Sequence, residues 1–387
     1  MSRLHYWHPV FASRKLTTRR PAGIRLDGRD LALFRTCDGK LGAIDDKCAH
    51  RRMKLSRGRI EGERVICPYH GWSFNTAGEG ESPSAPKLHA CVASYDCAES
   101  AGAIWVKARG SEQPLPSFAK EGWDFAGAVF NELRAPLQLV IDNFSEIEHT
   151  VTTHPHFGFD PKRAHEAVIK LEADDDSVTV RGHGPAKRPP LDTCWSVAFR
   201  RGDRFHADYT FRFDPPRSTV THWWSDPQTG SERKFKYHIV HYFVAQDEAV
   251  TLLVTFCFLK TGRRLLRMLK PMTARLFRSR TWETVEEDAV LLSHLADQST
   301  SLEGMKLSRF DPVLALTRER LARIYGGGPP APIALPAAVC APRESASTAA
   351  TSSARETSFP ASGPFPRTRQ TQRLIPDSRS GGGSGGS

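Results

Sequence analysis

The chain has 387 residues, of which 39% are hydrophobic and 25% charged, a composition typical of a soluble globular protein with room for two domains. The net charge of +11 could indicate nucleic-acid binding, but the arginines are scattered and no nucleic-acid-binding motif is present. An acidic protein partner explains the charge at least as well. No window approaches the roughly 18 apolar residues of a membrane span, and the N-terminus lacks the apolar stretch of a secretory signal. We therefore expect a cytoplasmic protein with no nucleic-acid partner and no membrane span.

Short alternating segments predict an all-β first domain over residues 1–115. The stretches at 23–46 and 62–81 alternate apolar and polar residues and are cut by D-G and N-T-A-G turn signals. The segment EQPLPSFAK at 112–120 is typical of a linker.

Residues 116–326 predict a second domain of mixed type. A helical stretch at 135–150 is followed by several strands between about 165 and 260, among them the apolar run at 249–259, and by a helical stretch including 281–298. This order predicts an α+β domain whose sheet is flanked by helices from both ends. Residues 327–387 are rich in Pro, Ala and Ser and predict a disordered tail that ends in an engineered Gly/Ser linker.

Two Cys-His pairs in the first domain have the spacing of metal ligands. Cys48 and His50 stand one residue apart, Cys67 and His70 stand two apart, and sixteen residues separate the pairs. A structural zinc ion uses the same ligand types, but zinc sites that mix them usually pair Cys with Cys and His with His. The spacing therefore favours another metal group, with structural zinc as the alternative.

This ligand pattern resembles that of Rieske proteins, in which two Cys hold one iron of a [2Fe-2S] cluster and two His hold the other. The run C-P-Y-H-G-W from Cys67 and the segment Y-W-H-P-V at 6–10 are similar to the oxygenase branch, the Rieske non-haem iron oxygenases. The resemblance covers about residues 5–325. It implies a [2Fe-2S] cluster held by Cys48, His50, Cys67 and His70, whose neutral imidazoles raise the reduction potential above that of an all-Cys cluster.

A second group of candidate ligands lies at 140–159. Glu146 and His149 are three residues apart, which on a helix places them on one face. His154 follows five residues after His149, so we expect the helix to end near Thr150 and His154 to fold back before Pro155. Two imidazoles and one carboxylate form the facial triad of non-haem Fe(II) oxygenases. A zinc hydrolase is a weaker interpretation because the H-E-x-x-H base is absent.

The resemblance implies that an Asp on a late helix completes this mononuclear iron site. In this family a Glu-Asp pair is followed by apolar residues, and this pattern selects Asp288 as the ligand. Its apolar neighbours at 289–292 predict that this side of the helix faces inward, and Glu287 is the alternative ligand. By the same resemblance Asn143 lies beside the iron. Glu146 bridges His149 to His70 of a neighbouring subunit in a homotrimer, although many relatives have Asp at that position.

The fold and function implied by the resemblance are a helix-grip (START-like) antiparallel sheet in the second domain and a Rieske monooxygenase activity. A ferredoxin or flavin reductase with an acidic docking face would deliver electrons from NAD(P)H, and O₂ would serve as cosubstrate. The substrate would be a small aromatic, heterocyclic or alkaloid-like molecule that is hydroxylated or oxidatively dealkylated. The alternatives are a cis-dihydroxylating ring dioxygenase, and an electron-transfer or binding protein whose second domain is non-catalytic.

Overall fold

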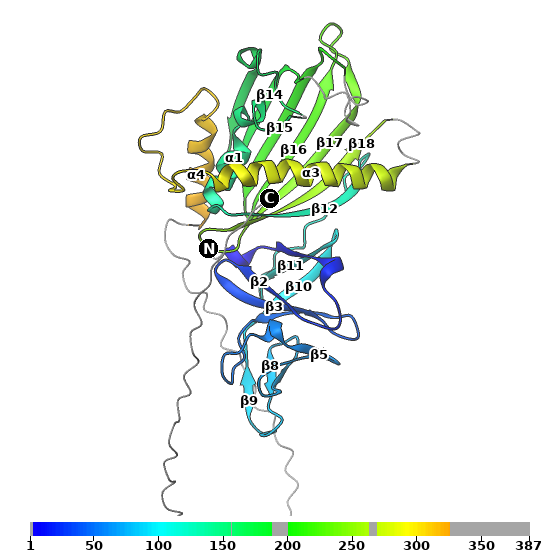
Figure 1. Ribbon diagram of the computed structural model, residues 1–387, viewed down its shortest axis with the longest axis vertical. Coiled ribbons are helices and arrows are strands. Elements are labelled where there is room, and N and C mark those ends of the chain that lie inside the picture. The colour runs from blue at the N-terminus through cyan, green and yellow to red at the C-terminus, as the bar shows by residue number, and fades with distance from the viewer. Residues whose placement is uncertain (1–2, 156, 188–199, 263–268, 326–387) are drawn as a thin grey trace, which may run out of the picture. The chain divides into compact units, whose positions relative to one another are not determined.

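A computed structural model describes residues 3–155, 157–187, 200–262 and 269–325 (Figure 1). Two antiparallel sheets make up the first part, together with the short 3₁₀ helices η1 (Arg3–His5), η2 (Ser13–Lys15) and η3 (Leu55–Arg57). The larger sheet has the order β1-β11-β10-β4-β3-β2 and consists of β1 (His8–Ala12), β2 (Ala22–Leu26), β3 (Arg29–Arg35), β4 (Leu41–Asp45), β10 (Ser94–Ser100) and β11 (Ala103–Ala108). The smaller sheet runs β5 to β9 in order and consists of β5 (Arg59–Glu61), β6 (Arg64–Ile66), β7 (Ser73–Phe74), β8 (Glu79–Glu81) and β9 (His89–Cys91). The predicted all-β character of this part is confirmed.

One antiparallel sheet with helices beside it forms the second part, as predicted. Its order is β12-β18-β17-β16-β15-β14-β13, with β12 (Asp124–Leu133), β13 (Val168–Ala173), β14 (Ser177–Pro185), β15 (Arg204–Phe213), β16 (Pro216–Ser225), β17 (Glu232–Ala245) and β18 (Thr251–Lys260). The helices in the described ranges are α1 (Leu137–Ser145), η4 (Glu148–Val151), η5 (Ala164–Glu166), α3 (Lys270–Ser293) and α4 (Pro312–Tyr325).

Strand β18 is buried on both faces, which explains its continuous apolar run. Leu253, Cys257 and Leu259 belong to the core of the second part, whereas the residues at 254, 256 and 258 pack into a core shared with the first part. In that shared core the Trp105 ring of β11 stacks on Phe256 with 5.5 Å between centroids. The two parts are therefore joined by a common apolar core.

Helix α3 lies across the seven-stranded sheet (Figure 1). Its buried residues recur every three or four positions and form one stripe: Ala274, Phe277, Thr281, Val285, Asp288 and Leu292. Asp288 is the charged member of this stripe and is 2% exposed. The fold thus directs one carboxylate of α3 toward the sheet.

Four features differ from the sequence predictions. The helix predicted at 135–150 ends at Ser145, and the late helix begins at Lys270 and ends at Ser293 instead of continuing to 298. Helix α4 is not predicted as a separate element. The segment 112–120 has no regular structure, as expected of a linker, but Leu115 and Phe118 pack against the shared core.

The predicted tail at 327–387 lies outside the described residues. Within the described ranges, no helix combines the length and apolar character needed to cross a membrane.

Candidate metal centres

The two Cys-His segments of the first part fold into matching loops. The Cys48 N–H donates to the carbonyl five residues later (2.9 Å), and the Cys48 carbonyl accepts from the N–H four residues later (2.9 Å). Cys67 makes the same two bonds at 2.7 and 3.1 Å. The residue four positions after each cysteine is left-handed, with φ +61° at Arg52 and +70° at Gly71. Each loop therefore holds one Cys and one His in equivalent surroundings.

The four donors of these loops divide into a buried and an exposed pair. Cys48 and Cys67 are 1% and 2% exposed, whereas His50 and His70 lie at the surface with 4.6 Å between ring centroids. Partial desolvation, aided by the charges of His50 and Arg51, lowers the pKa of His70 and favours the neutral imidazole that binds metal. Two inner thiols and two outer imidazoles fit a [2Fe-2S] group with one iron on each pair.

At the second candidate site, Glu146 ends one helix and begins the next. Its backbone is extended (φ −87°, ψ 143°), so Glu146 and His149 do not share a face of one α-helix, and that part of the prediction is wrong. Its carboxylate instead accepts hydrogen bonds from the backbone N–H groups of Glu148 (2.6 Å) and His149 (3.1 Å) at the start of η4. The same carboxylate accepts from His149 Nδ1 at 2.6 Å.

A tight loop returns His154 toward His149. The Lys187 ammonium donates to the carbonyls of Thr150 (2.9 Å) and His154 (2.5 Å) and so joins the two ends of the loop. Gly158 has φ +105°, and a Cβ there would lie 2.7 Å from the Thr150 carbonyl oxygen. The His154 ring stacks on Phe157 at 4.7 Å. The loop therefore has little freedom to move His154 away.

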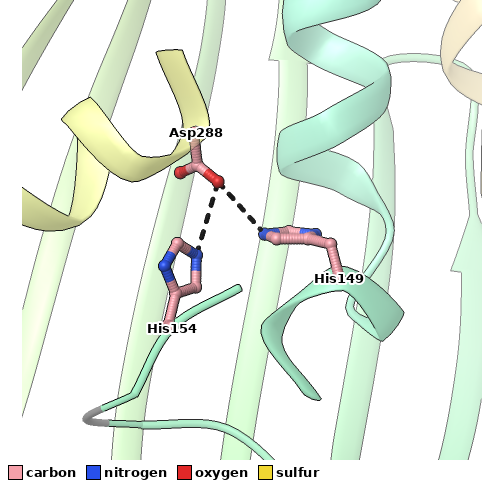
Figure 2. A group of neighbouring side chains, drawn as sticks. All are labelled: His149, His154 and Asp288. Carbon is pink, nitrogen blue, oxygen red and sulfur yellow. Dashed lines mark ion pairs between the residues drawn. The ribbon is translucent and has the colours of Figure 1, made fainter. Parts of the chain in front are cut away.

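His149, His154 and Asp288 converge on one point (Figure 2). Asp288 Oδ1 lies 3.6 Å from His149 Nε2 and 3.4 Å from His154 Nε2, and the three donor atoms lie within 4.8 Å of one another. This buried oxygen has no hydrogen-bond partner among the described residues. An unsatisfied carboxylate oxygen facing two imidazoles fits a bound divalent cation.

Two further carboxylates orient the imidazoles. Glu146 accepts from His149 Nδ1, and Glu287 accepts from His154 Nδ1 at 2.8 Å, so both rings turn Nε2 toward Asp288. Burial alone would lower the pKa of His154, but the nearby Asp288 and Glu287 carboxylates outweigh it and raise the pKa to about 9. Glu287, the fallback ligand of the sequence analysis, thus holds a ligand candidate in place.

A cavity adjoins the three converging side chains between α3 and the sheet. Its apolar lining includes Phe144, Phe157, Val220, Ile239 and Phe277, and its polar lining includes Tyr209, His222, Tyr237 and His241. The strand residues come from β15, β16 and β17 and point to the face that α3 covers.

Asn143, which the resemblance places beside the iron, does not line this cavity. Its buried Nδ2 has no hydrogen-bond partner within the described part of the chain. Lys187 and His222 are site residues that the sequence analysis missed. A histidine in an alternating strand, as at His222, is the signal that could have identified the cavity wall.

Comparisons with known proteins match both parts. The Rieske [2Fe-2S] domain family matches residues 6–96, and the family of the vanillate O-demethylase oxygenase C-terminal domain matches residues 133–323. The chain belongs to the Rieske non-haem iron oxygenase family. The cofactors of this family are a [2Fe-2S] cluster and a non-haem iron, in agreement with the two groups of donors. Structural zinc in the first part is thereby disfavoured.

Curated relatives match part of their length. Methylxanthine N1-demethylase NdmA of Pseudomonas putida is 31% identical over 43% of this chain and 52% of its own. The 4beta-methylsterol monooxygenase of Methylococcus capsulatus is 30% identical over 46% of this chain and 50% of its own. Protein TIC 55 of Arabidopsis thaliana is 28% identical over 44% and 34%. The matched regions thus span about half of these relatives or less.

Solved structures match the whole fold. Dicamba monooxygenase bound to 3,6-dichlorosalicylic acid has a TM-score of 0.69 at 16% identity and covers 84% of this chain and 98% of its own. Pseudomonas putida NdmA with caffeine has a TM-score of 0.59 at 20% identity and covers 84% of this chain and 92% of its own. The two-part architecture is therefore shared with these oxygenases.

Proposed function

We propose that the chain is the oxygenase component of a Rieske monooxygenase that hydroxylates or oxidatively dealkylates a small aromatic, heterocyclic or alkaloid-like substrate. The observation that carries this proposal is the convergence of His149, His154 and Asp288 beside an aromatic-lined cavity. An electron-transfer protein with a non-catalytic second domain has no need for a buried carboxylate oxygen without a partner. The names of two relatives, one a demethylase and the other a monooxygenase, favour these reactions over cis-dihydroxylation.

In this proposal the chain's residues hold and orient two metal groups. When bound, a [2Fe-2S] cluster on Cys48, His50, Cys67 and His70 would supply single electrons, and a ferrous ion on His149, His154 and Asp288 would activate O₂. Glu146 and Glu287 accept hydrogen bonds from the Nδ1–H groups of the two imidazoles. Each Nδ1 therefore stays protonated, and each Nε2 lone pair is left for the metal. The apolar walls formed by Phe144, Phe157 and Phe277 exclude water and pack against a substrate ring.

A second copy of the chain and a reductase complete the proposed system. Glu146 is 15% exposed, which leaves its carboxylate accessible for the proposed bridge to His70 of a neighbouring copy in a homotrimer. Lys47, Arg51 and Arg52 are exposed around the first metal site and fit an acidic docking face on a ferredoxin or flavin reductase that draws on NAD(P)H. The need for NAD(P)H favours the cytoplasm as the location.

Substitution of one triad histidine tests the proposed function. The purified chain with a surrogate reductase, NADH and a panel of methoxy- and N-methyl-substituted aromatics should consume O₂ and release a hydroxylated or demethylated product. His149→Ala should abolish product while the visible absorbance of the cluster persists, because the cluster ligands are untouched. Equal product yield from the variant and the wild type would refute the proposal.

A further inference from the structure

Three side chains on adjacent strands form a hydrogen-bonded row in the cavity wall. His222 of β16 lies between Tyr237 of β17, at 2.5 Å from its Nδ1, and Tyr209 of β15, at 2.8 Å from its Nε2. All three side chains line the cavity beside the triad. The row follows from the sheet register. His222 pairs directly with Tyr237 of β17, and on β15 it pairs with Ala207, two residues before Tyr209.

The imidazole in the middle of this row is neutral. His222 is 3% exposed, and burial, aided by His241 and His154, lowers its pKa to about 3. A neutral imidazole has one N–H donor and one acceptor nitrogen. The two tyrosine hydroxyls must therefore play opposite parts, one donating to His222 and the other accepting from it.

Two protons are used within this row and a third is left over. The row has two hydroxyl protons and one imidazole proton, and each of its two contacts uses one proton. With Tyr237 donating to Nδ1, the Nε2–H of His222 donates to Tyr209 Oη, and the hydroxyl proton of Tyr209 is the one left over. The hydroxyl proton of Tyr209 has no acceptor among the described residues, although Tyr209 is only 9% exposed.

We propose that Tyr209 is a specificity-determining residue that donates a hydrogen bond to an acceptor atom of the substrate. The acceptor is a carbonyl oxygen, an ether oxygen or a heteroaromatic nitrogen, because each has a lone pair and no proton of its own. This inference rests on the proposed function, which makes the cavity the substrate site. His222 and Tyr237 are positioning residues that keep the Tyr209 proton directed away from the row.

The charges around the cavity favour an uncharged substrate group beside Tyr209. The Arg280 guanidinium in the lining is paired with Glu283 at 2.6 Å on the same helix. Burial lowers the pKa of His241, the other lining imidazole outside the triad, to about 3, so it carries no charge. With no unpaired cation outside the triad among the described lining residues, a substrate carboxylate placed away from the triad would lose its hydration without gaining a counter-ion.

Matched ligands that differ in one acceptor test this proposal. Equilibrium dialysis of the full, iron-loaded chain under nitrogen would give dissociation constants for acetophenone and ethylbenzene, and for quinoline and naphthalene. Tyr209→Phe should weaken acetophenone and quinoline about tenfold and leave the two hydrocarbons unchanged, since only the former accept a hydrogen bond. Retained hydrocarbon binding also shows that the variant is folded.

A buried tyrosine on the opposite face of β17 provides the control. Tyr242→Phe removes a hydroxyl in the core shared by the two parts, so all four affinities should stay unchanged. An equal loss for both members of each pair in Tyr209→Phe, no loss at all, or no binding of either acceptor ligand to the wild type would overturn the proposal. Because binding needs neither O₂ nor a reductase, a failure of the proposed oxygenase activity would show separately, as absent product with this binding pattern intact.

Discussion

Glu287 should control how tightly the second metal site holds iron, although it is not one of the proposed ligands. Its carboxylate accepts the Nδ1 proton of His154 at 2.8 Å, which fixes the ring with Nε2 toward Asp288 and makes that nitrogen more basic. Glu287→Ala removes this contact and leaves His154, which is 2% exposed, with an unpaired donor. Loss of a carboxylate that supports a ligating histidine typically weakens metal binding 10- to 100-fold, which corresponds to about 1.4 to 2.7 kcal/mol.

An anaerobic titration measures this effect. Mononuclear iron would be removed with a mild chelator, and Fe²⁺ would be titrated back against a competing fluorescent chelator. Glu287→Gln should lose less affinity than Glu287→Ala, because its amide oxygen can still accept from Nδ1. The control is Glu286→Gln, one residue earlier on α3, where the carboxylate accepts from Asn131 at 2.7 Å and does not touch the triad. Wild-type affinity in Glu287→Ala would refute the reasoning.

Two further outcomes are expected. Because the pKa of His154 is raised to about 9, iron binding at neutral pH must displace a proton from this ring. The apparent Fe²⁺ affinity should therefore rise about tenfold per pH unit up to about pH 9 and then level off. An affinity that does not change with pH contradicts this. The protonated ring stabilises the iron-free fold fully below its ordinary pKa of 6.5 and loses that effect as pH rises through about 9, so iron-free protein should melt at a lower temperature at high pH. Arg318→Ala leaves the buried Asp142 carboxylate without its guanidinium partner and should lower the free energy of unfolding in urea by about 3 kcal/mol. The control is Arg323→Ala, whose partner Asp175 is 98% exposed, and it should change this free energy by less than about 0.5 kcal/mol.

The metal-ligand spacings carry most of what the sequence predicts about the sites. Cys48, His50, Cys67 and His70 are fixed by two short loops, so local spacing is enough to indicate their chemistry. The convergence of Asp288 on two histidines more than 130 residues away depends on how α3 crosses the sheet, and only the resemblance to a family indicates it. The spacing of the buried residues along α3 would have been better support for an inward-facing Asp288 than its apolar neighbours, because two of those neighbours, Val290 and Leu291, are 56% and 43% exposed.

Two other features could not be read from periodicity. The residues around Glu146 continue a helical pattern, yet α1 ends there and the Glu146 carboxylate accepts hydrogen bonds from two backbone N–H groups of the next turn, an alternative to the helix that periodicity does not reveal. Part of the cavity wall was hidden because the second half of β17 is buried on both faces, so alternation there does not distinguish the face toward α3 from the face toward the first part.

Iron and sulfide content tests the central claim most directly, since the claim is that one chain holds two distinct iron centres. Anaerobically reconstituted wild-type protein should contain about three irons and about two acid-labile sulfides per chain, and His149→Ala about two irons with the same sulfide content. The wild type should also give the electron paramagnetic resonance signal of a ferrous–nitric oxide adduct, which the variant should lack. Two irons in the wild type, or the same iron content and the same signal in both proteins, would contradict the account.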